Sequence, residues 1–284
     1  MNIHERIGYM QGRLSPLSEG RIQSFPWRHW QAEFPAAGGI GIGMMEWTLD
    51  QERLHDNPLM MRDGQEEIRQ LCSRYSFRIP SLTGDCFMQA PFWKASGAQR
   101  GALEEDFLAV ARACTAVGIS MIVVPLVDNG RLDNPGQEDR LIGFLEAQTK
   151  LLGAAGLQLV FESDFNPEEL ARFIGRLDPG LFGINYDIGN SAGLGYRPSE
   201  EFAAYGRRVL NVHVKDRIIG GTTVPLGTGS ADFEAVFNEL GRISYRGNFI
   251  LQTARAIDED HATPLSRYRD MTALWMSRSG LANP

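Results

Sequence analysis

Four short segments decide the fold: VFESD at residues 160–164, NYDIGN at 185–190, NVHVKDR at 211–217 and ILQTA at 250–254. Each belongs to an apolar run that ends in polar side chains, and a stretch with helical spacing follows. Apolar runs that alternate with helices are typical of parallel strands, which are buried on both faces. The segments therefore predict a parallel sheet whose strands end in polar residues along one edge.

The same unit recurs along the chain and gives eight expected strands, at 7–10, 40–48, 77–83, 121–127, 157–163, 183–187, 209–215 and 248–253. Helices are expected at 66–75, 103–117, 137–152, 199–205, 232–240 and 265–276, and NPEE at 166–169 is a helix start. Eight such units fit one closed TIM barrel. The alternative, an open doubly wound sheet, would carry a Gly-rich loop after an early strand, whereas GGIGIG at 38–43 stands ahead of its strand. We predict a single (β/α)₈-barrel catalytic domain over residues 1–284.

Composition and charge exclude several classes of function. The net charge is −7 with no long basic run, which argues against nucleic-acid binding and against a membrane-surface role. The N-terminus lacks an apolar stretch of signal-peptide length, and the longest β-like apolar run, MIVVPLV at 121–127, is too short to span a bilayer. We therefore expect a cytoplasmic protein whose three cysteines are reduced thiols.

The last four strands each end in a side chain that can bind a metal: Glu162, Asp187, His213 and Gln252. In a TIM barrel, residues at the carboxyl ends of the strands face the active site. Two carboxylates, an imidazole and an amide oxygen suit a divalent cation, manganese first, with magnesium, cobalt and zinc as alternatives. Taken alone, each carboxylate is compatible with a helix cap or a loop ion pair, and His213 is compatible with a buried core histidine. The occurrence of all four at one level predicts a metal site.

Other residues after the strands are expected to bind substrate. Asn190 and Arg217 follow the strands of two expected ligands, and Glu46 ends the second strand. Arg13 is suited to a phosphate or carboxylate, although a surface arginine is an equal alternative. The loop VPLGTGSADF at 224–233 contains Gly227 and Gly229 and opens a helix, where backbone N–H groups favour an anion. A plain Gly-rich turn is an equal alternative for this loop.

The sequence resembles the xylose isomerase-like TIM barrels, a broad group of sugar and sugar-phosphate isomerases and epimerases. The resemblance spans nearly the whole chain and is carried by GYMQGRLSP, MMEW, FES, YDIGN, NVHVKDR, PLGTGSADF and ILQ. It implies a metal bound by Glu162, Asp187 and His213, a sugar or sugar-phosphate substrate, and a homodimer or homotetramer. Ketose 3-epimerases of the group carry a glutamate where this chain has Gln252, and often a histidine where it has Asn190.

The replacement of glutamate by Gln252 bears directly on the chemistry. An amide oxygen can bind a metal, but it cannot accept a proton near neutral pH. Glu162 remains able to remove a proton beside a carbonyl while a metal stabilises the enediolate. Lys215 is a candidate for the second acid or base. The sequence therefore predicts a metal-dependent isomerase or epimerase with Glu162, Lys215 and Gln252 as the catalytic residues.

Three alternatives accompany this prediction. A metal-dependent dehydratase or lyase of the same group would act on a keto-polyol or keto-acid, and a sugar-binding barrel would have lost catalysis. Cleavage of abasic DNA is excluded because it needs extra metal-binding histidines, and the other histidines lie away from the strand ends. The aromatic residues after the third strand, Phe87, Phe92 and Trp93, are expected to cover a sugar ring, with a subunit contact as the alternative.

Overall fold

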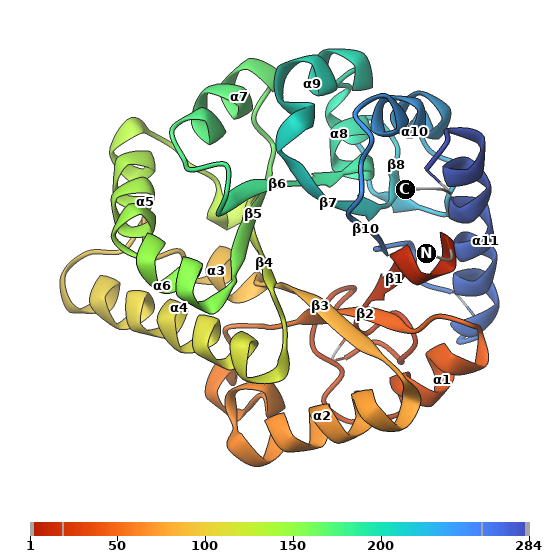
Figure 1. Cartoon of the computed structure of the whole chain (residues 1–284), viewed down its shortest axis with the longest axis horizontal. Helices are drawn as coiled ribbons and strands as arrows, with labels where there is room; N and C mark the ends of the chain where they lie inside the picture. Colours follow the sequence, from red (N-terminus) through yellow and green to blue (C-terminus); the bar gives the residue numbers. More distant parts are fainter. Residues whose placement is uncertain (1–2, 19, 257, 282–284) are drawn as a thin grey trace.

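A computed structural model describes residues 3–18, 20–256 and 258–281 and contains a closed barrel of eight parallel strands (Figure 1). The strands are neighbours in the order β1-β10-β7-β6-β5-β4-β3-β2. They are β1 (Ile7–Met10), β2 (Met44–Thr48), β3 (Arg78–Thr83), β4 (Met121–Leu126), β5 (Gln158–Ser163), β6 (Phe182–Asp187), β7 (Val209–Val214) and β10 (Asn248–Leu251). The predicted (β/α)₈ fold is confirmed, and each strand coincides with an expected one to within a few residues.

Helices form a ring around the barrel (Figure 1). The helices are α1 (Glu33–Gly39), α2 (Arg62–Tyr75), α3 (Asp85–Gln89), α4 (Gly97–Val117), α5 (Pro135–Ala147), α6 (Thr149–Ala155), α7 (Pro167–Gly175), α8 (Ile188–Leu194), α9 (Pro198–Tyr205), α10 (Phe233–Arg242) and α11 (Ala262–Arg278). The short helices α3 and α8 lie inside this ring, close to the strands (Figure 1). Short 3₁₀ turns are η1 (Ile3–Arg6), η2 (Leu54–Asp56), η3 (Pro58–Met60), η4 (Asp128–Gly130) and η5 (Gly206–Arg208). The helix expected at 137–152 is divided at Gln148 into α5 and α6.

Helix starts agree with the local sequence. Asn166 accepts a hydrogen bond from the backbone N–H of Glu169, and Pro167 occupies the first turn of α7. Asp187 caps α8 by accepting from the N–H of Asn190 at 2.8 Å. Asp187 is therefore both the last residue of β6 and the N-cap of α8. This placement holds its carboxylate at the barrel mouth.

Strand register determines which side chains meet inside the barrel. Asp187 is aligned with His213 across β6 and β7, and Ile250 is aligned with His213 across β7 and β10. The Asn211 amide donates to Asn185 Oδ1 at 2.9 Å inside the barrel. The alternation along β7 therefore turns Asn211 and His213 to the interior.

The loop after β7 carries a small antiparallel ribbon, β8 (Asp216–Arg217) with β9 (Thr223–Val224). A cavity of about 460 Å³ opens beside this loop, among the carboxyl ends of the strands. Of the helices that the structure describes, none is long and apolar enough to cross a membrane.

Candidate metal centre and the cavity beside it

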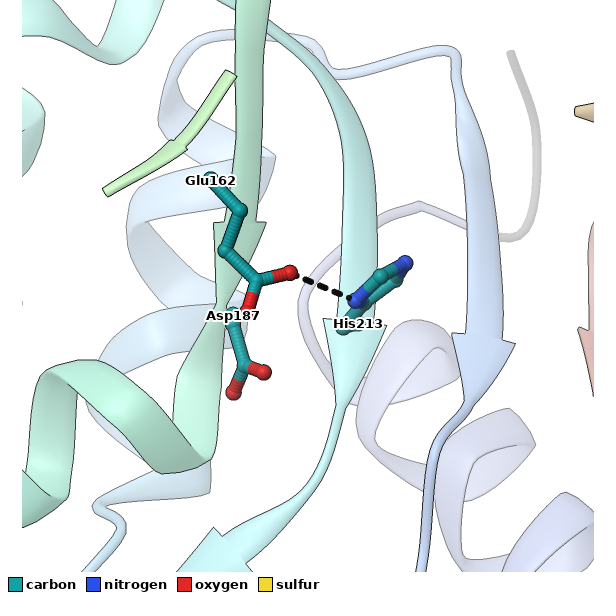
Figure 2. Close-up of side chains that lie close together, drawn as sticks. All are labelled: Glu162, Asp187 and His213. Atoms are coloured by element: carbon teal, nitrogen blue, oxygen red, sulfur yellow. Dashed lines mark ion pairs between the residues drawn. The ribbon is translucent and has the colours of Figure 1, made fainter. Parts of the chain in front are cut away.

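Glu162, Asp187 and His213, which we call the strand triad, come together at the ends of β5, β6 and β7 (Figure 2). Each offers one ligand atom, and the three atoms lie within 4.8 Å of one another. All three residues are buried. Figure 2 shows the Glu162 carboxylate facing the His213 ring, with the Asp187 carboxylate close to both, and an ion pair of 3.1 Å joins His213 Nδ1 to Glu162 Oε2. Two carboxylates and an imidazole in this arrangement are a ligand set for a divalent metal.

His213 is oriented by a second carboxylate. Its Nε2 lies 2.7 Å from Oε1 of Glu46, which is fully buried, so Nδ1 is the atom turned toward Glu162. Asn185 Nδ2 lies 3.0 Å from Nδ1. A carboxylate behind a ligating histidine fixes the ring and its tautomer. Burial alone would lower the pKa of His213, but Glu46 and Glu162 raise it to about 10.

Two asparagines hold Glu162. Asn190 Nδ2 donates to Oε1 at 2.6 Å, and Asn185 Nδ2 donates to Oε2 at 2.9 Å. Burial opposes the charged form of Glu162, yet His213 and Lys215 together lower its pKa. Burial raises the pKa of Asp187, and Lys215 opposes that rise. The two carboxylates thus share the positive charge of His213 and Lys215.

The ammonium of Lys215 lies beside the strand triad. It donates to Asp187 Oδ2 at 3.1 Å and to Asn190 Oδ1 at 3.0 Å, and lies 3.5 Å from Gln252 Oε1. Arg217 also donates to Asn190 Oδ1, at 3.0 Å. The oxygens of Asp187 and Gln252 therefore converge on a cation. Gln252, which the sequence predicted as the fourth metal ligand, thus has its Oε1 directed at the Lys215 ammonium.

A chain of hydrogen bonds runs from Gln252 across the cavity. Gln252 Nε2 donates to Gln23 Oε1 at 2.8 Å, and Gln23 Nε2 donates to Asp85 Oδ2 at 2.8 Å. We call this set the Gln252–Gln23–Asp85 chain. Its members come from the end of β10, from the loop between β1 and α1, and from the first turn of α3.

The charged residues that line the cavity are mostly acidic. The carboxylates are Asp85, Asp128, Glu162 and Asp164, the cations are Lys215 and Arg217, and the amides are Gln23, Asn190 and Gln252. Of the residues expected to bind substrate, Asn190 and Arg217 line this cavity, and so do the expected catalytic residues Glu162, Lys215 and Gln252.

Two of the other expected substrate residues have structural contacts instead. Glu46 is fully buried and accepts hydrogen bonds from Ser81, Asn211 and His213, so it supports the strand triad and is closed to substrate. The Arg13 guanidinium donates to the backbone oxygens of Thr253 and Ile22, at 3.0 Å in each case. Neither residue lines the cavity.

The glycine loop also differs from expectation. The N–H groups of Gly227 and Gly229 donate to Asp216 Oδ2 at 2.9 and 2.8 Å, and the N–H of Ala231 donates to Oδ1. Asp216 is fully buried. The anion that these amides bind is therefore the chain's own carboxylate, and substrate binding by these two glycines stays a prediction that their hydrogen bonds do not support.

The expected aromatic cover over the sugar is wrong. Phe87, Phe92 and Trp93 are 5%, 1% and 0% exposed and pack in the core against helix α4, where Phe107 contacts both phenylalanines. Their apolar faces are buried between the barrel and its helices. Met88 lines the cavity in their place.

Asp85 and Gln23 were missed by the sequence analysis. Asp85 follows β3 directly, so the rule that identified Glu162 and Asp187 would have found it if applied to the third strand. Gln23 lies in an irregular loop, and nothing in its sequence surroundings distinguishes it. Asn185 and Asn211 belong to the inward faces of their strands, and they serve the strand triad through Glu162, His213 and Glu46.

The structure is a closed (β/α)₈ barrel with a cluster of side chains at its mouth that could hold a metal ion. The sequence profile of the xylose isomerase-like TIM barrel family matches residues 34–271, and the chain belongs to this family. The resemblance seen in the sequence is thereby confirmed.

Three similar proteins illustrate the family. The L-ribulose-5-phosphate 3-epimerase UlaE of Escherichia coli is 24% identical over 263 residues, covering 89% of this chain and 92% of its own. The D-allulose 3-epimerase of Methylomonas sp. superposes with a TM-score of 0.72 at 15% identity, over 95% of this chain and 97% of its own. The IOLI protein with a bound zinc atom gives a TM-score of 0.70 at 12% identity, over 97% and 98% of the two chains. The expectation of an enzyme is confirmed.

Proposed function

We propose that the strand triad holds one divalent metal ion, with Gln252 as a further ligand, and that the site epimerises or isomerises a sugar. The observation that carries this proposal is the convergence of three ligand atoms from three successive strands within 4.8 Å. The epimerases among the similar proteins support the reaction class. We take residues 1–284 to act as one catalytic domain.

The donor set fits a metal in two respects. His213 Nε2 is held by Glu46, which leaves Nδ1 as the nitrogen that faces the carboxylates of the strand triad. The oxygens of Asp187 and Gln252 already converge on the Lys215 ammonium, so this corner attracts a cation. The oxygen-rich set favours manganese or magnesium, and the zinc atom in the IOLI structure, which has a similar fold, is consistent with a related metal.

The chain's own residues would carry the rest of the chemistry. A metal, when bound, would polarise the substrate carbonyl. Glu162 would remove the proton from the adjacent carbon, because its carboxylate lines the cavity. Asn190 and Arg217 lie on the same wall and offer hydrogen-bond donors for sugar hydroxyls. Lys215 would stabilise negative charge that develops on a substrate oxygen.

We further propose that the substrate is a free sugar. Gly227 and Gly229 give their amides to Asp216, and the charged lining of the cavity is mainly acidic, both of which disfavour a phosphate. The names of the similar proteins include both kinds of substrate, a sugar phosphate for UlaE and a free sugar for the allulose epimerase. A matched comparison of free and phosphorylated ketoses therefore belongs in the test.

The proposal is tested by solvent isotope exchange. The metal-stripped protein is incubated in D₂O with ketopentoses and ketohexoses, free and phosphorylated, with and without Mn²⁺. We expect metal-dependent deuterium beside the carbonyl of a recovered free sugar, together with an epimer or isomer. Loss of one water from the product would instead indicate the dehydratase. Binding of a sugar without exchange would indicate a barrel that has lost catalysis, and absence of exchange across the panel would contradict the proposal.

A further inference from the structure

Asp85 is a buried carboxylate on the cavity wall that the predicted mechanism does not use. It is the first residue of α3, directly after β3, and it is 5% exposed. It lines the same cavity as Glu162, Lys215 and Gln252. A buried carboxylate is costly to charge without partners, and one that faces a cavity is a candidate for a functional role there.

The hydrogen bonds of Asp85 connect it to the position that lacks an acid. Gln252 cannot transfer a proton, and its Nε2 is used to donate to Gln23 at 2.8 Å. Gln23 in turn donates to Asp85 Oδ2 at 2.8 Å. Among the described residues, no hydrogen bond reaches Oδ1 of Asp85. One oxygen therefore orients the carboxyl group, and the other is available to a ligand in the cavity.

The charges around Asp85 come from several elements. Burial is the main cause that raises its pKa to about 7, and Asp50 and Glu162 add to the effect. Arg13 acts in the opposite direction. The neighbouring Cys86 is buried on the same short helix, and its own pKa is raised. A carboxyl group with this pKa can both give and take a proton near neutral pH.

We propose that Asp85 is the second proton-transfer group of the site and supplies the carboxyl function that Gln252 lacks. The inference rests on the proposed function. Glu162 takes the proton from the carbon beside the carbonyl, the C–H electron pair forms a carbon–carbon double bond, and the π pair of the carbonyl moves onto its oxygen to give an enediolate. Asp85 then gives its proton to that carbon from its own wall of the cavity, which forms the new C–H bond, returns the oxygen pair to the C=O bond and leaves Asp85 as a carboxylate. Proton exchange of Glu162 and Asp85 with water restores the starting state, with no net oxidation.

The test uses the sugar identified by the exchange panel, with Mn²⁺ in D₂O, on the wild type and on Asp85→Asn. We expect Asp85→Asn to form product at least ~100-fold more slowly, because a positioned acid contributes about that much. Exchange of solvent deuterium into recovered substrate, which needs only Glu162, should stay within about threefold of the wild type. The change of rate with pH near 7 should disappear.

Two companion variants separate chemistry from structure. Asp85→Asn combined with Gln252→Glu should recover product formation, because a carboxylate returns to the adjacent position. Glu138→Gln neutralises a buried carboxylate that pairs with Arg172 and Arg176 and does not line the cavity, and it should keep both rates within about threefold.

The outcomes distinguish this inference from the proposed function. Normal product formation by a folded Asp85→Asn would overturn the role of Asp85 alone. A parallel fall of exchange and product formation would also overturn it, because that result indicates a structural role. Failure of the wild type to exchange deuterium would overturn both the inference and the function on which it rests.

Discussion

The strand triad and the Gln252–Gln23–Asp85 chain border the same cavity but are built in different ways. Every member of the strand triad lies at a strand end, and Glu46, Asn185 and Asn190 hold its side chains in place. The Gln252–Gln23–Asp85 chain instead connects a strand end, a loop and a short helix through two amide hydrogen bonds. Barrel register therefore places the strand triad, whereas loop residues place the partners of Gln252 elsewhere on the cavity wall. A fixed set of strand-end residues beside loops that differ is the general way in which one barrel fold can host different reactions.

The largest effect should come from the strand triad itself. Glu162→Gln and Asp187→Asn each remove one negative charge from the ligand set while keeping side-chain size. We expect metal-dependent deuterium exchange to fall by at least ~10³-fold in either variant. Glu138→Gln is the matched control, because Glu138 is a buried carboxylate paired with Arg172 and Arg176 away from the site. Deuterium exchange that stays at the wild-type rate in both variants would contradict the proposal that the strand triad holds the metal.

The support behind the strand triad should matter next. Glu46→Gln keeps the shape of the residue but weakens its grip on His213 Nε2, so we expect metal affinity to fall by ~10–100-fold. Titration calorimetry on the metal-stripped protein measures this change. Glu201→Gln is the control: Glu201 is also buried and accepts from three hydroxyls, those of Tyr186, Ser191 and Tyr205. An equal loss in the control would mean that general destabilisation causes the effect.

The titration of Asp85 should make the free energy of unfolding depend on pH. Burial raises its pKa to about 7, above the value near 4 of an unfolded chain, so the folded protein holds the extra proton between these limits. The free energy of unfolding should therefore fall as the pH rises from about 4 to about 7. Asp85→Asn should be more stable than the wild type at pH 8 by roughly 1–3 kcal/mol, and equal to it at pH 4.

Urea unfolding of metal-stripped protein at the two pH values measures this difference. Asp139→Asn, at an exposed position, should show no such dependence on pH. If Asp85→Asn and the wild type differ by the same amount at both pH values, the carboxyl group does not titrate in the folded protein as described.

Gln252 lies where the two regions meet. Gln252→Glu adds a negative charge beside the Lys215 ammonium and the strand triad, and we expect metal affinity to rise by about tenfold. The same titration on Gln70→Glu, which adds a charge on the exposed surface of α2, should show no change. A fall in affinity would mean that the new carboxylate pairs with Lys215 and leaves the metal site.

The sequence was sufficient for the barrel and for the residues at strand ends. A strand of alternating inward and outward residues places Glu162, Asp187 and His213 at one level, whatever the loops do. It was insufficient for predicting which partner each polar group binds. Glu46 was expected to bind substrate, yet its partner is His213, 167 positions along the chain. Gly227 and Gly229 were expected to bind an anion, and they do, but the anion is Asp216, only 11 and 13 positions away.

Arg13 and Asp85 are two further residues whose partners the sequence did not predict. Arg13 was predicted to bind substrate and does not line the cavity, whereas Asp85 was not predicted and does. Arg13 had the charge for a substrate contact, but its guanidinium donates to the backbone oxygens of Ile22 and Thr253. Asp85 followed a strand, as the candidate ligands did, but its significance depends on Gln23, which only the folded loop brings close. Hydrogen bonds between residues of different loops depend on the path of each loop backbone in space. The spacing of apolar residues in the sequence does not predict that path.

The most direct test of the account is the binding of Mn²⁺ to the metal-stripped protein, followed by the electron paramagnetic resonance signal of the free ion. We predict one tight site per chain in the wild type and in Glu138→Gln, and a loss of affinity of at least ~100-fold in Asp187→Asn. A wild type that binds no Mn²⁺, Co²⁺ or Zn²⁺, or an Asp187→Asn variant that binds Mn²⁺ as tightly as the wild type, would contradict the assignment of the strand triad as a metal centre.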